Sequence, residues 1–292
     1  MDFEKWLHKN TCDLKGKLIA VTGTTGGLGQ ELCRFLCELH ADLILLDRNA
    51  QKSAKLQKEL QIMYPECEIS RIKVDLEDMN SVKIAVRTLK NRPLDMFIHN
   101  AGAYSIPRHK CSTGYDNVFQ INFVSPYYMI TELIPHLKIR NGHVVAVGSI
   151  AHNYSKTDPQ DHDFSTRKAS SKVYGNAKRF LMFSLYELFK NETDVTLSIV
   201  HPGIAFTNIT AHYPKLIFAV IKHPMKVFFM KPKKAALSIL RGVFKHTGYH
   251  EWIGPRLFDV WGLPKKRTLK TCKPSESQQI GLSAKEIYEK LI

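Results

Sequence analysis

The sequence has no long apolar run, and none of its hydrophobic stretches approaches the ~20 residues that a membrane-spanning helix needs. It also lacks an apolar segment near the N-terminus of the kind that marks a secretory signal, so we expect a cytoplasmic protein. Internal repeats and low-complexity stretches are absent as well. With 292 residues, 44% hydrophobic and 24% charged, residues 1–292 are expected to form a single domain.

Cysteine is scarce and unpatterned. The six cysteines form no C-x-x-C pair and have no histidine at the spacing of a zinc site, so we expect no metal. Cys33 and Cys37 lie one turn apart in a predicted helix, where buried thiols are expected rather than a disulfide. The full set is Cys12, Cys33, Cys37, Cys67, Cys111 and Cys272.

Acidic residues are few beside basic ones, 27 against 42, and residues 215–273 hold fourteen Lys or Arg but two acids. Three interpretations of this basic segment stay open. It forms a substrate lid at about 204–230, a lid that also makes peripheral membrane contact through 215–234, or a site for an anionic substrate. Nucleic-acid binding is not expected, because no recognisable nucleic-acid-binding module accompanies the basic residues.

Strand-like and helix-like segments alternate regularly along the chain. The predicted strands are 17–22, 42–47, 69–74, 94–98, 143–148, 195–200 and 250–253. The predicted helices are 27–40, 50–62, 78–91, 113–138, 169–190 and 231–246. This order predicts an α/β fold, a Rossmann-type doubly wound parallel sheet with helices on both faces. Ligands of such sheets bind beyond the carboxyl ends of the strands, where we expect the functional residues to converge.

A glycine-rich turn joins the first predicted strand to the first predicted helix. Glycine permits a tight turn and close approach of a pyrophosphate, while the helix N-terminus presents N–H groups and the positive end of its dipole. Strand, glycine turn and helix together predict a dinucleotide site. The residues expected to contact the cofactor here are Thr22, Gly23, Thr25, Gly27, Leu28 and Gly29.

Tyr174 and Lys178 lie four residues apart in a predicted helix and therefore share a face. A free phenol has a pKa near ~10, and a nearby ammonium, together with the positive charge of an oxidised nicotinamide, favours the phenolate. A phenol tuned in this way can exchange a proton with an alcohol or carbonyl while hydride moves to or from a nicotinamide. Ser149, which follows the fifth predicted strand, is expected to hydrogen-bond the same oxygen.

In order and spacing these motifs resemble the classical short-chain dehydrogenase/reductase family, over roughly residues 14 to 210. The glycine turn has the spacing T-G-x-x-x-G-x-G, and His99-Asn100-Ala101-Gly102 matches three residues of the family's N-N-A-G turn. Further matches are Asn122, Ser149, the Tyr174-x-x-x-Lys178 pair and Pro202-Gly203.

The resemblance implies an oxidoreductase that uses a nicotinamide cofactor. Its implied catalytic residues are Asn122, Ser149, Tyr174 and Lys178, with Asn122 supporting a bound water and Lys178 also holding the nicotinamide ribose. Its implied cofactor contacts also include Leu76, Asn100, Ala101, Gly102, Tyr174, Lys178, Pro202, Gly203 and Thr207.

Ser149 and Tyr174 are 25 residues apart, farther than is usual in the family, because of a polar insert at 154–170. This insert resembles the retinol-dehydrogenase-like branch, which implies a lipophilic alcohol or carbonyl substrate of steroid or retinoid type.

The choice between NAD and NADP rests on neighbouring residues after the second strand. The carboxylate of Asp47 can accept hydrogen bonds from an adenosine ribose and repel a 2′-phosphate. Arg48 is a residue type that binds such a phosphate. Asp75 is expected at the adenine edge with either cofactor. The sequence favours NAD because of Asp47, and NADP stays the alternative.

The C-terminal part from about 247 to 292 is expected to cap the pocket, with turns at 254–256 and 261–264. A helix is predicted at 283–292 with Ser283 as its N-cap. It packs either on the body of the protein or on a partner subunit in a homo-oligomer. Rival functions are a non-catalytic dinucleotide-sensing protein and a peripheral membrane-binding protein on the same fold. An extended-branch epimerase is disfavoured by the glycine spacing.

Overall fold

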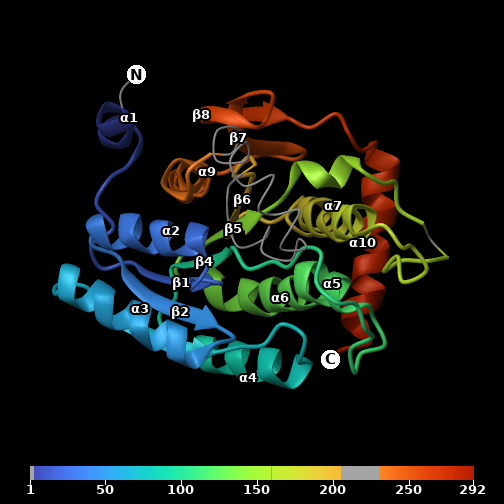
Figure 1. Ribbon diagram of the computed structural model, residues 1–292, viewed down its shortest axis with the longest axis horizontal. Helices are drawn as coiled ribbons and strands as arrows, with labels where there is room; N and C mark the ends of the chain where they lie inside the picture. The colour runs from blue at the N-terminus through green and yellow to red at the C-terminus, as the bar shows by residue number, and fades with distance from the viewer. Residues whose placement is uncertain (1–2, 159, 205–229) are drawn as a thin grey trace, which may run out of the picture.

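The computed structural model describes residues 3–158, 160–204 and 230–292 (Figure 1). Its centre is an eight-stranded sheet in the order β3-β2-β1-β4-β5-β6-β7-β8. All neighbouring strands are parallel except β7 and β8. The strands are β1 (Leu18–Thr22), β2 (Asp42–Asp47), β3 (Ile69–Lys73), β4 (Met96–His99), β5 (His143–Val147), β6 (Thr196–Val200), β7 (Glu251–Leu257) and β8 (Trp261–Thr268). The predicted α/β fold is therefore confirmed.

Helices cover both faces of the sheet (Figure 1). The helices of one face are α4 (Met79–Lys90), α6 (Ser125–Lys138) and α7 (Ser170–Leu188), with α10 (Pro274–Glu289) packed on α7. The opposite face carries α1 (Phe3–Asn10), α2 (Gly27–Glu38), α3 (Ala50–Met63) and α9 (Pro232–Phe244). The two layers arise because β1, β4 and β5 are buried along their whole length and need apolar cover on both sides.

The predicted helix at 113–138 is interrupted. Asp116 caps a short helix, α5 (Asn117–Phe119), by accepting a hydrogen bond from the Val118 N–H. A π-helical turn, Gln120–Val124, then leads into α6. Single π turns in helices often lie at functional sites, and this one contains the predicted catalytic Asn122.

The C-terminal region differs from the expected turns at 254–256 and 261–264. Both segments are strand, and β7 and β8 form an antiparallel hairpin. The last helix also begins earlier than predicted, at Pro274, so Ser283 lies inside α10 and is not its cap. Ile280, Ala284 and Ile287 are buried in the core, so this helix packs on the body of its own chain.

The core thiols and the parallel strands match the sequence interpretation. Cys33 and Cys37 are free and buried in α2.

Since strand order reverses between β1 and its neighbours β2 and β4, the turns after β1 and β4 lie side by side at the carboxyl edge of the sheet. We call this side the carboxyl edge and the opposite side, where the parallel strands begin, the amino edge.

Candidate active site

The glycine turn after β1 is built by close backbone contacts. Gly23 has φ +69°, and a Cβ there would lie 2.8 Å from the Cα of Ala101. A Cβ on Gly29 would lie 2.3 Å from the carbonyl oxygen of Gly23. In contrast, nothing lies within 3.6 Å of a Cβ on Gly27. Glycine is therefore required at 23 and 29 by the fold itself, whereas a side chain at 27 would make only an ordinary contact, with Pro232 at 3.7 Å.

The turn ends at the N-terminus of α2, where Gly26 provides no side-chain cap. The first N–H groups of a helix have no partner within the helix, and here they face the carboxyl edge with the positive end of the helix dipole. This cradle fits the pyrophosphate of a dinucleotide, as predicted from the sequence.

Thr22 ties the glycine turn to the turn after β4. Its hydroxyl oxygen accepts hydrogen bonds at 3.0 Å from the N–H groups of Asn100 and Ala101. Because the Thr22 oxygen is the acceptor in both of these bonds, its O–H group is free to donate a third hydrogen bond. The acceptor is Nδ1 of His99, 3.2 Å away. The Asn100 side chain donates to the carbonyl oxygens of Thr22 and Gly23. The two motifs thus form one rigid unit.

His99 is the clearest departure from the family motif, and the structure buries it completely. Burial, with a contribution from Lys178, holds its pKa well below the usual histidine range, so the ring is neutral. Since Nδ1 accepts from Thr22, Nε2 carries the proton, and it has no hydrogen-bond partner among the described residues. The neutral His99 ring can therefore donate one hydrogen bond, from Nε2, at the position where the family motif has an asparagine.

Asn122 joins the π turn to the loop after β4. Its amide nitrogen donates at 2.8 Å to the carbonyl oxygens of Ala103 and Val118. A Cβ on Gly102 would meet the Asn122 side-chain oxygen at 2.8 Å and Lys178 Nζ at 3.6 Å. Asn122, Gly102 and Lys178 are therefore in close contact, although they come from three different segments.

Tyr174, Ser149 and Lys178 also converge at this edge. The Ser149 side chain hydrogen-bonds Tyr174. Lys178 is buried, donates to the Val147 carbonyl oxygen at 2.9 Å and places Nζ 5.9 Å from the centre of the Tyr174 ring. The four predicted catalytic side chains thus form one continuous group.

The pKa values of Tyr174 and Lys178 are both shifted by burial. Burial raises the pKa of Tyr174 to about 12, against a lowering by the Ser149 hydrogen bond. Burial also lowers the pKa of Lys178 to about 7, so the lysine carries only part of a charge at neutral pH. Tyr174 is therefore a protonated phenol in this structure, and the phenolate expected beside an oxidised nicotinamide stays a prediction.

Tyr104 is a residue that the sequence interpretation missed. Its ring meets the Tyr174 ring edge-on, with 5.2 Å between the centroids, and it adds to the rise in the Tyr174 pKa. An aromatic residue two positions after Gly102 was the signal available in the sequence.

Asp47 has a different role from the one predicted. Its buried carboxylate accepts four hydrogen bonds, from the Thr24 hydroxyl, the N–H and hydroxyl of Thr25, and the Ser53 hydroxyl. These donors fill the lone pairs that a carboxylate offers. The expectation that Asp47 is free to accept bonds from a ribose is therefore not borne out; the carboxylate shapes the glycine turn instead.

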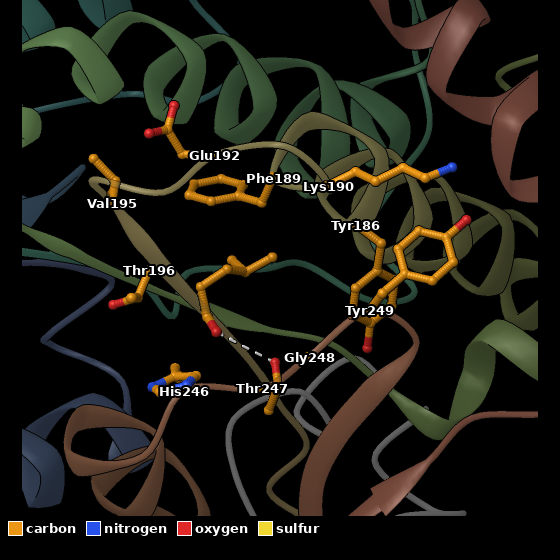
Figure 2. A pocket seen from close by; sticks show the side chains of 11 residues that line it. Tyr186, Phe189, Lys190, Glu192, Val195, Thr196, His246, Thr247, Gly248 and Tyr249 are labelled. Carbon is orange, nitrogen blue, oxygen red and sulfur yellow. Dashed lines mark hydrogen bonds between the residues drawn. The ribbon is translucent and has the colours of Figure 1, made fainter.

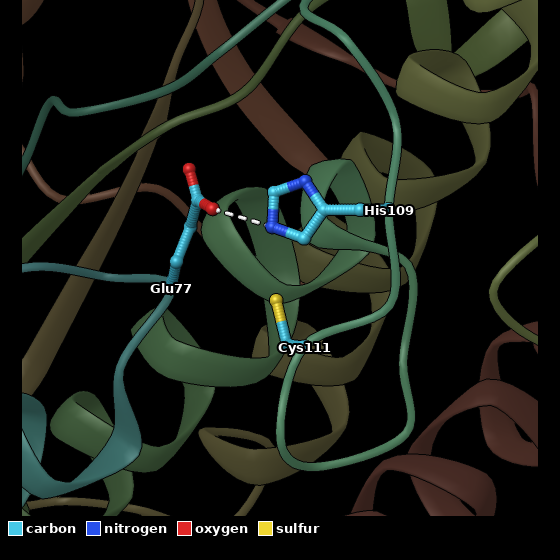
Figure 3. A group of neighbouring side chains, drawn as sticks. All are labelled: Glu77, His109 and Cys111. Atoms are coloured by element: carbon cyan, nitrogen blue, oxygen red, sulfur yellow. Dashed lines mark ion pairs between the residues drawn. The ribbon is translucent and has the colours of Figure 1, made fainter.

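Arg48 lies in the opposite situation. Its side chain is 68% exposed and forms an ion pair with Glu77 at 3.4 Å. A neighbouring set of side chains comprises Glu77, His109 and Cys111, whose donor atoms lie within 4.8 Å of one another (Figure 3). Glu77 pairs with His109 at 3.0 Å, while burial and nearby acids raise the Cys111 pKa to about 11.

These three residues come nearest to a metal-binding group in the described part of the chain. No spacing pattern in the sequence predicts this group, because Glu77 and His109 lie on different loops. In this structure Glu77 joins Arg48 to the loop after β4. Beside it, Asp75 is half-buried and accepts from the Glu77 N–H, and Leu76 is buried. Arg48, Asp75, Glu77 and His109 are thus linked by contacts on the side of the site where the adenosine of the cofactor is expected.

The insert at 154–170 folds over the start of α7. Arg108 holds it by donating to the Phe164 carbonyl oxygen at 3.0 Å and to Asp116 at 2.8 Å. Phe164 itself is buried although its φ is +55°, an uncommon conformation for a bulky residue. Its ring packs in a small apolar cluster that includes Tyr174 and consists of Ile106, Val118, Phe164, Val173 and Tyr174.

The predicted contacts after β6 are described only in part. Gly203 has φ +81°, and with Pro202 it lies at the carboxyl edge next to the end of β5. Thr207 and most of the expected lid at 204–230 lie outside the described residues. The described ends of that segment, Ile204 and Met230, are joined by a backbone hydrogen bond of 3.0 Å.

A separate pocket of about 320 Å³ lies at the amino edge, far from this group (Figure 2). It is bordered by the start of β6 and by the end of α7, with Tyr186, Tyr249 and Thr247 among its lining residues. Its position at the opposite ends of the strands separates it from Ser149 and the glycine turn.

The sequence also matches a known protein family. A model of the short chain dehydrogenase family matches residues 17–215. The chain belongs to this family. As a short-chain dehydrogenase it is an oxidoreductase of alcohols and carbonyls that uses NAD or NADP.

Curated relatives agree with this assignment. Short-chain dehydrogenase TIC 32 A of Brassica napus is 30% identical over 247 residues, 78% of this chain and 76% of that protein. Mouse retinol dehydrogenase 12 is 29% identical over 68% of this chain and 64% of its own length. Human polyprenol dehydrogenase is 25% identical over 80% of this chain and 77% of its own length. The predicted retinol-dehydrogenase-like kinship is confirmed.

Solved structures support the fold. An uncharacterized protein from Mycobacterium paratuberculosis matches with a TM-score of 0.75 and 19% identity, over 98% of this chain and 97% of that one. The alcohol dehydrogenase of Thermococcus sibiricus, complexed with 5-hydroxy-NADP, matches with a TM-score of 0.60 and 19% identity, over 77% and 88%.

Proposed function

We propose that the protein is a carbonyl reductase and alcohol dehydrogenase in which Tyr174 exchanges the substrate proton. The observation that carries this proposal is the contact between Tyr174 and Ser149, with buried Lys178 beneath them at the carboxyl edge. A bound nicotinamide supplies the hydride that reduces the carbonyl carbon, or accepts it in the reverse reaction.

The raised pKa of Tyr174 suits the direction of carbonyl reduction. A phenol with a pKa of about 12 is protonated at neutral pH and donates its proton to the oxygen that gains charge. Ser149 hydrogen-bonds that same oxygen and stabilises the charge. Lys178, with a pKa of about 7, holds a proton close to the phenol and can return one after each turnover.

We propose a lipophilic substrate, on the basis of the side chains around Tyr174. Ile106, Val118, Phe164 and Val173 pack with Tyr174 in one apolar cluster, in which only Ile106 and Tyr174 keep some exposed surface. The immediate surroundings of the reacting phenol are therefore apolar. The names of the relatives that act on retinol and polyprenol agree with this chemistry.

The preferred cofactor is proposed to be NADP(H), which reverses the preference drawn from the sequence. The Asp47 carboxylate is already engaged by four protein donors, so it offers the ribose hydroxyls no acceptor. The exposed guanidinium of Arg48 is available to a 2′-phosphate, which binds it more strongly than a single carboxylate at 3.4 Å does.

Tyr174→Phe tests the catalytic role. The variant is expected to lose roughly 10²–10⁴-fold in kcat, while dinucleotide binding measured by fluorescence titration is retained. The substrates are a panel of steroid, retinoid and aliphatic carbonyls with reduced cofactor. Turnover at the wild-type rate in this variant would refute the proposed role of Tyr174.

Arg48→Ala tests the cofactor preference. Its KM for NADPH is expected to rise about tenfold or more, and its KM for NADH to stay unchanged. Arg92→Ala is a matched control, because Arg92 is also an exposed arginine paired with a glutamate at 3.4 Å, in this case Glu68. Equal changes for both cofactors would contradict a phosphate contact at Arg48.

The membrane contact expected at 215–234 falls almost wholly on residues that the structure does not describe. Among the described helices, none is long and apolar enough to cross a bilayer. Peripheral attachment through that segment stays a prediction, and so does assembly into a homo-oligomer.

A further inference from the structure

Three large apolar side chains lie exposed around one turn, between β7 and β8. Phe258 is 82% exposed, Leu257 53% and Trp261 39%. Single exposed apolar residues are ordinary on protein surfaces, but neighbouring ones on a protruding turn indicate an interaction surface.

This turn has a defined conformation. Phe258 and Asp259 have φ of +52° and +56°, a left-handed conformation that is rare outside glycine. Two contacts maintain it: Arg267 bonds both carboxylate oxygens of Asp259 at 3.3 Å, and the ring of His201 contacts the Asp259 carbonyl oxygen at 3.0 Å. A strained turn persists only when its surroundings impose it, so the exposed side chains are presented in a fixed place.

The turn also lies at the active-site side of the molecule. Because β7 is parallel to β6, its last residue Leu257 is at the carboxyl edge. The Val260 carbonyl oxygen lies 2.6 Å from the position of a Cβ on Gly203, directly after β6. Ser149 follows β5, the next strand in the sheet. The exposed apolar residues thus lie at the same edge as Ser149, two strands along the sheet.

Basic residues surround the apolar turn. Arg256 and Lys265 are exposed on the two arms of the hairpin. Further lysines lie at the start of α9 on the same edge of the sheet, where Lys231 and Lys234 are exposed and Lys233 Nζ lies over the rings of Phe3 and Phe35. The acidic residue of the turn, Asp259, is bound by Arg267. The exposed charge here is positive.

Exposed apolar side chains with cations around them match the interface of an anionic bilayer, in which apolar groups enter the acyl region and cations contact headgroups. The core of a protein–protein interface, in contrast, is depleted of lysine. We propose that Leu257, Phe258 and Trp261, with Arg256 and Lys265, form a docking surface for anionic lipid bilayers. This inference rests on the proposed lipophilic substrate, because docking here places the active-site mouth against the phase that holds such molecules.

Sedimentation with vesicles tests the apolar part. The full chain is mixed with phosphatidylserine–phosphatidylcholine vesicles, and the bound fraction is measured for wild type and for the double variant Leu257→Ser/Phe258→Ser. Removing two inserted apolar groups is expected to weaken the apparent affinity about tenfold or more. The matched control is Ile62→Ser/Ile139→Ser, because these side chains are 72% and 77% exposed at the amino edge.

A second pair of variants tests the charged part. Arg256→Gln/Lys265→Gln is expected to lose binding to phosphatidylserine vesicles and most of its salt dependence. Lys58→Gln/Arg87→Gln removes the same charges from exposed positions of α3 and α4, and is expected to bind as the wild type does. Equal binding of the hairpin and control variants would overturn the proposal.

Two further readouts separate the alternatives. Phe258-dependent dimerisation in light scattering, with no vesicle binding, would assign the surface to a second copy of the chain and overturn lipid docking. Turnover of a short water-soluble carbonyl should be unchanged in the hairpin variants, while Tyr174→Phe should bind vesicles normally. The lipid proposal and the proposed chemistry can therefore fail independently.

Discussion

The two edges of the sheet use polar residues in opposite ways. At the amino edge, Asp95 accepts hydrogen bonds from the Leu18 N–H at 3.0 Å, from Lys17 at 3.1 Å and from Arg140 at 3.0 Å. Burial alone would raise the pKa of Asp95, but these three bonds outweigh it and lower the pKa. The carboxylate is charged and fully partnered, which is the arrangement of a structural residue.

At the carboxyl edge the polar residues are less well satisfied. Lys178 is buried with a lowered pKa, Tyr174 has a raised one, and buried polar atoms of His99 and Asn100 have no partner among the described residues. Such groups are tolerated where binding or catalysis uses them. The comparison teaches that Asp95 is arranged for stability, whereas the group around Tyr174 and Lys178 at the carboxyl edge is arranged for chemistry. The following predictions test that division.

Ser149→Ala should give the largest effect. Losing the hydrogen bond to the reacting oxygen is expected to lower kcat by roughly 10²–10³-fold. The thermal midpoint should fall only slightly, because the structural bond lost is the one from the Ala151 N–H to the Ser149 hydroxyl at 3.2 Å. Steady-state kinetics and thermal unfolding of the same sample measure both. A large fall in thermal stability with unchanged kcat would place Ser149 with the structural residues instead.

Gly29→Ala should weaken dinucleotide binding by roughly 100-fold. The added Cβ meets the Gly23 carbonyl oxygen at 2.3 Å and Thr24 Cα at 2.8 Å, so the turn must shift. Calorimetric titration with NADPH measures the loss. Gly26→Ala, whose Cβ has no neighbour closer than 3.6 Å, controls for the effect of a methyl group on folding. A normal affinity in Gly29→Ala would show that the turn adjusts freely.

Asp95→Asn should affect the amino edge alone. The variant loses the charge that Lys17 and Arg140 contact, so the free energy of unfolding is expected to fall by about 1–3 kcal/mol. Its kcat/KM should equal that of the wild type. Urea unfolding and kinetics measured together decide the case. If activity falls as much as stability does, the two edges are not independent.

The lowered pKa of Lys178 is expected to make the free energy of unfolding depend on pH. Its pKa is about 7 in the folded protein and near 10.5 ordinarily, so between these values the unfolded chain binds one more proton. Stability should therefore rise with pH in this window, by up to about 1.4 kcal/mol per unit from this group. The destabilisation is greatest below pH 7 and disappears above about 10.5.

The variant Lys178→Met should flatten this slope, measured by urea unfolding between about pH 7 and pH 9. Lys172→Met, which changes an exposed lysine close by in the same helix, should keep the wild-type slope. Identical slopes in the two variants would mean that Lys178 is not the titrating group.

Much of the fold followed from local patterns. Strands such as Asp42–Asp47 and helices such as Ala50–Met63 were predicted to within a residue or two, because buried apolar runs and helical periodicity are local signals. The β7–β8 hairpin was mistaken for turns, since Gly254, Pro255 and Pro264 are residues that usually punctuate strands. The π turn at Asn122 was missed because its contacts with Ala103 and Gly102 are not local.

The site shows the same limit. Placing Gly23, Asn100, Ser149 and Tyr174 together needed only the rule that ligands bind beyond the carboxyl ends of parallel strands. The raised pKa of Tyr174 was not predicted, because its largest cause is burial. Burial is a property of the whole fold and has no signature in a four-residue spacing.

The sequence by itself determined the family, the alternation of strands and helices and the residues that meet at the carboxyl edge, because each of these depends on short motifs and local periodicity. Only the tertiary structure decided that Asp47 is engaged by Ser53 and Thr24, that the Arg48 side chain is exposed, and that Phe258 is exposed at the carboxyl edge. The physical reason is that hydrogen-bond saturation, burial and exposure depend on which distant segments come into contact, and a single position in the chain does not record that.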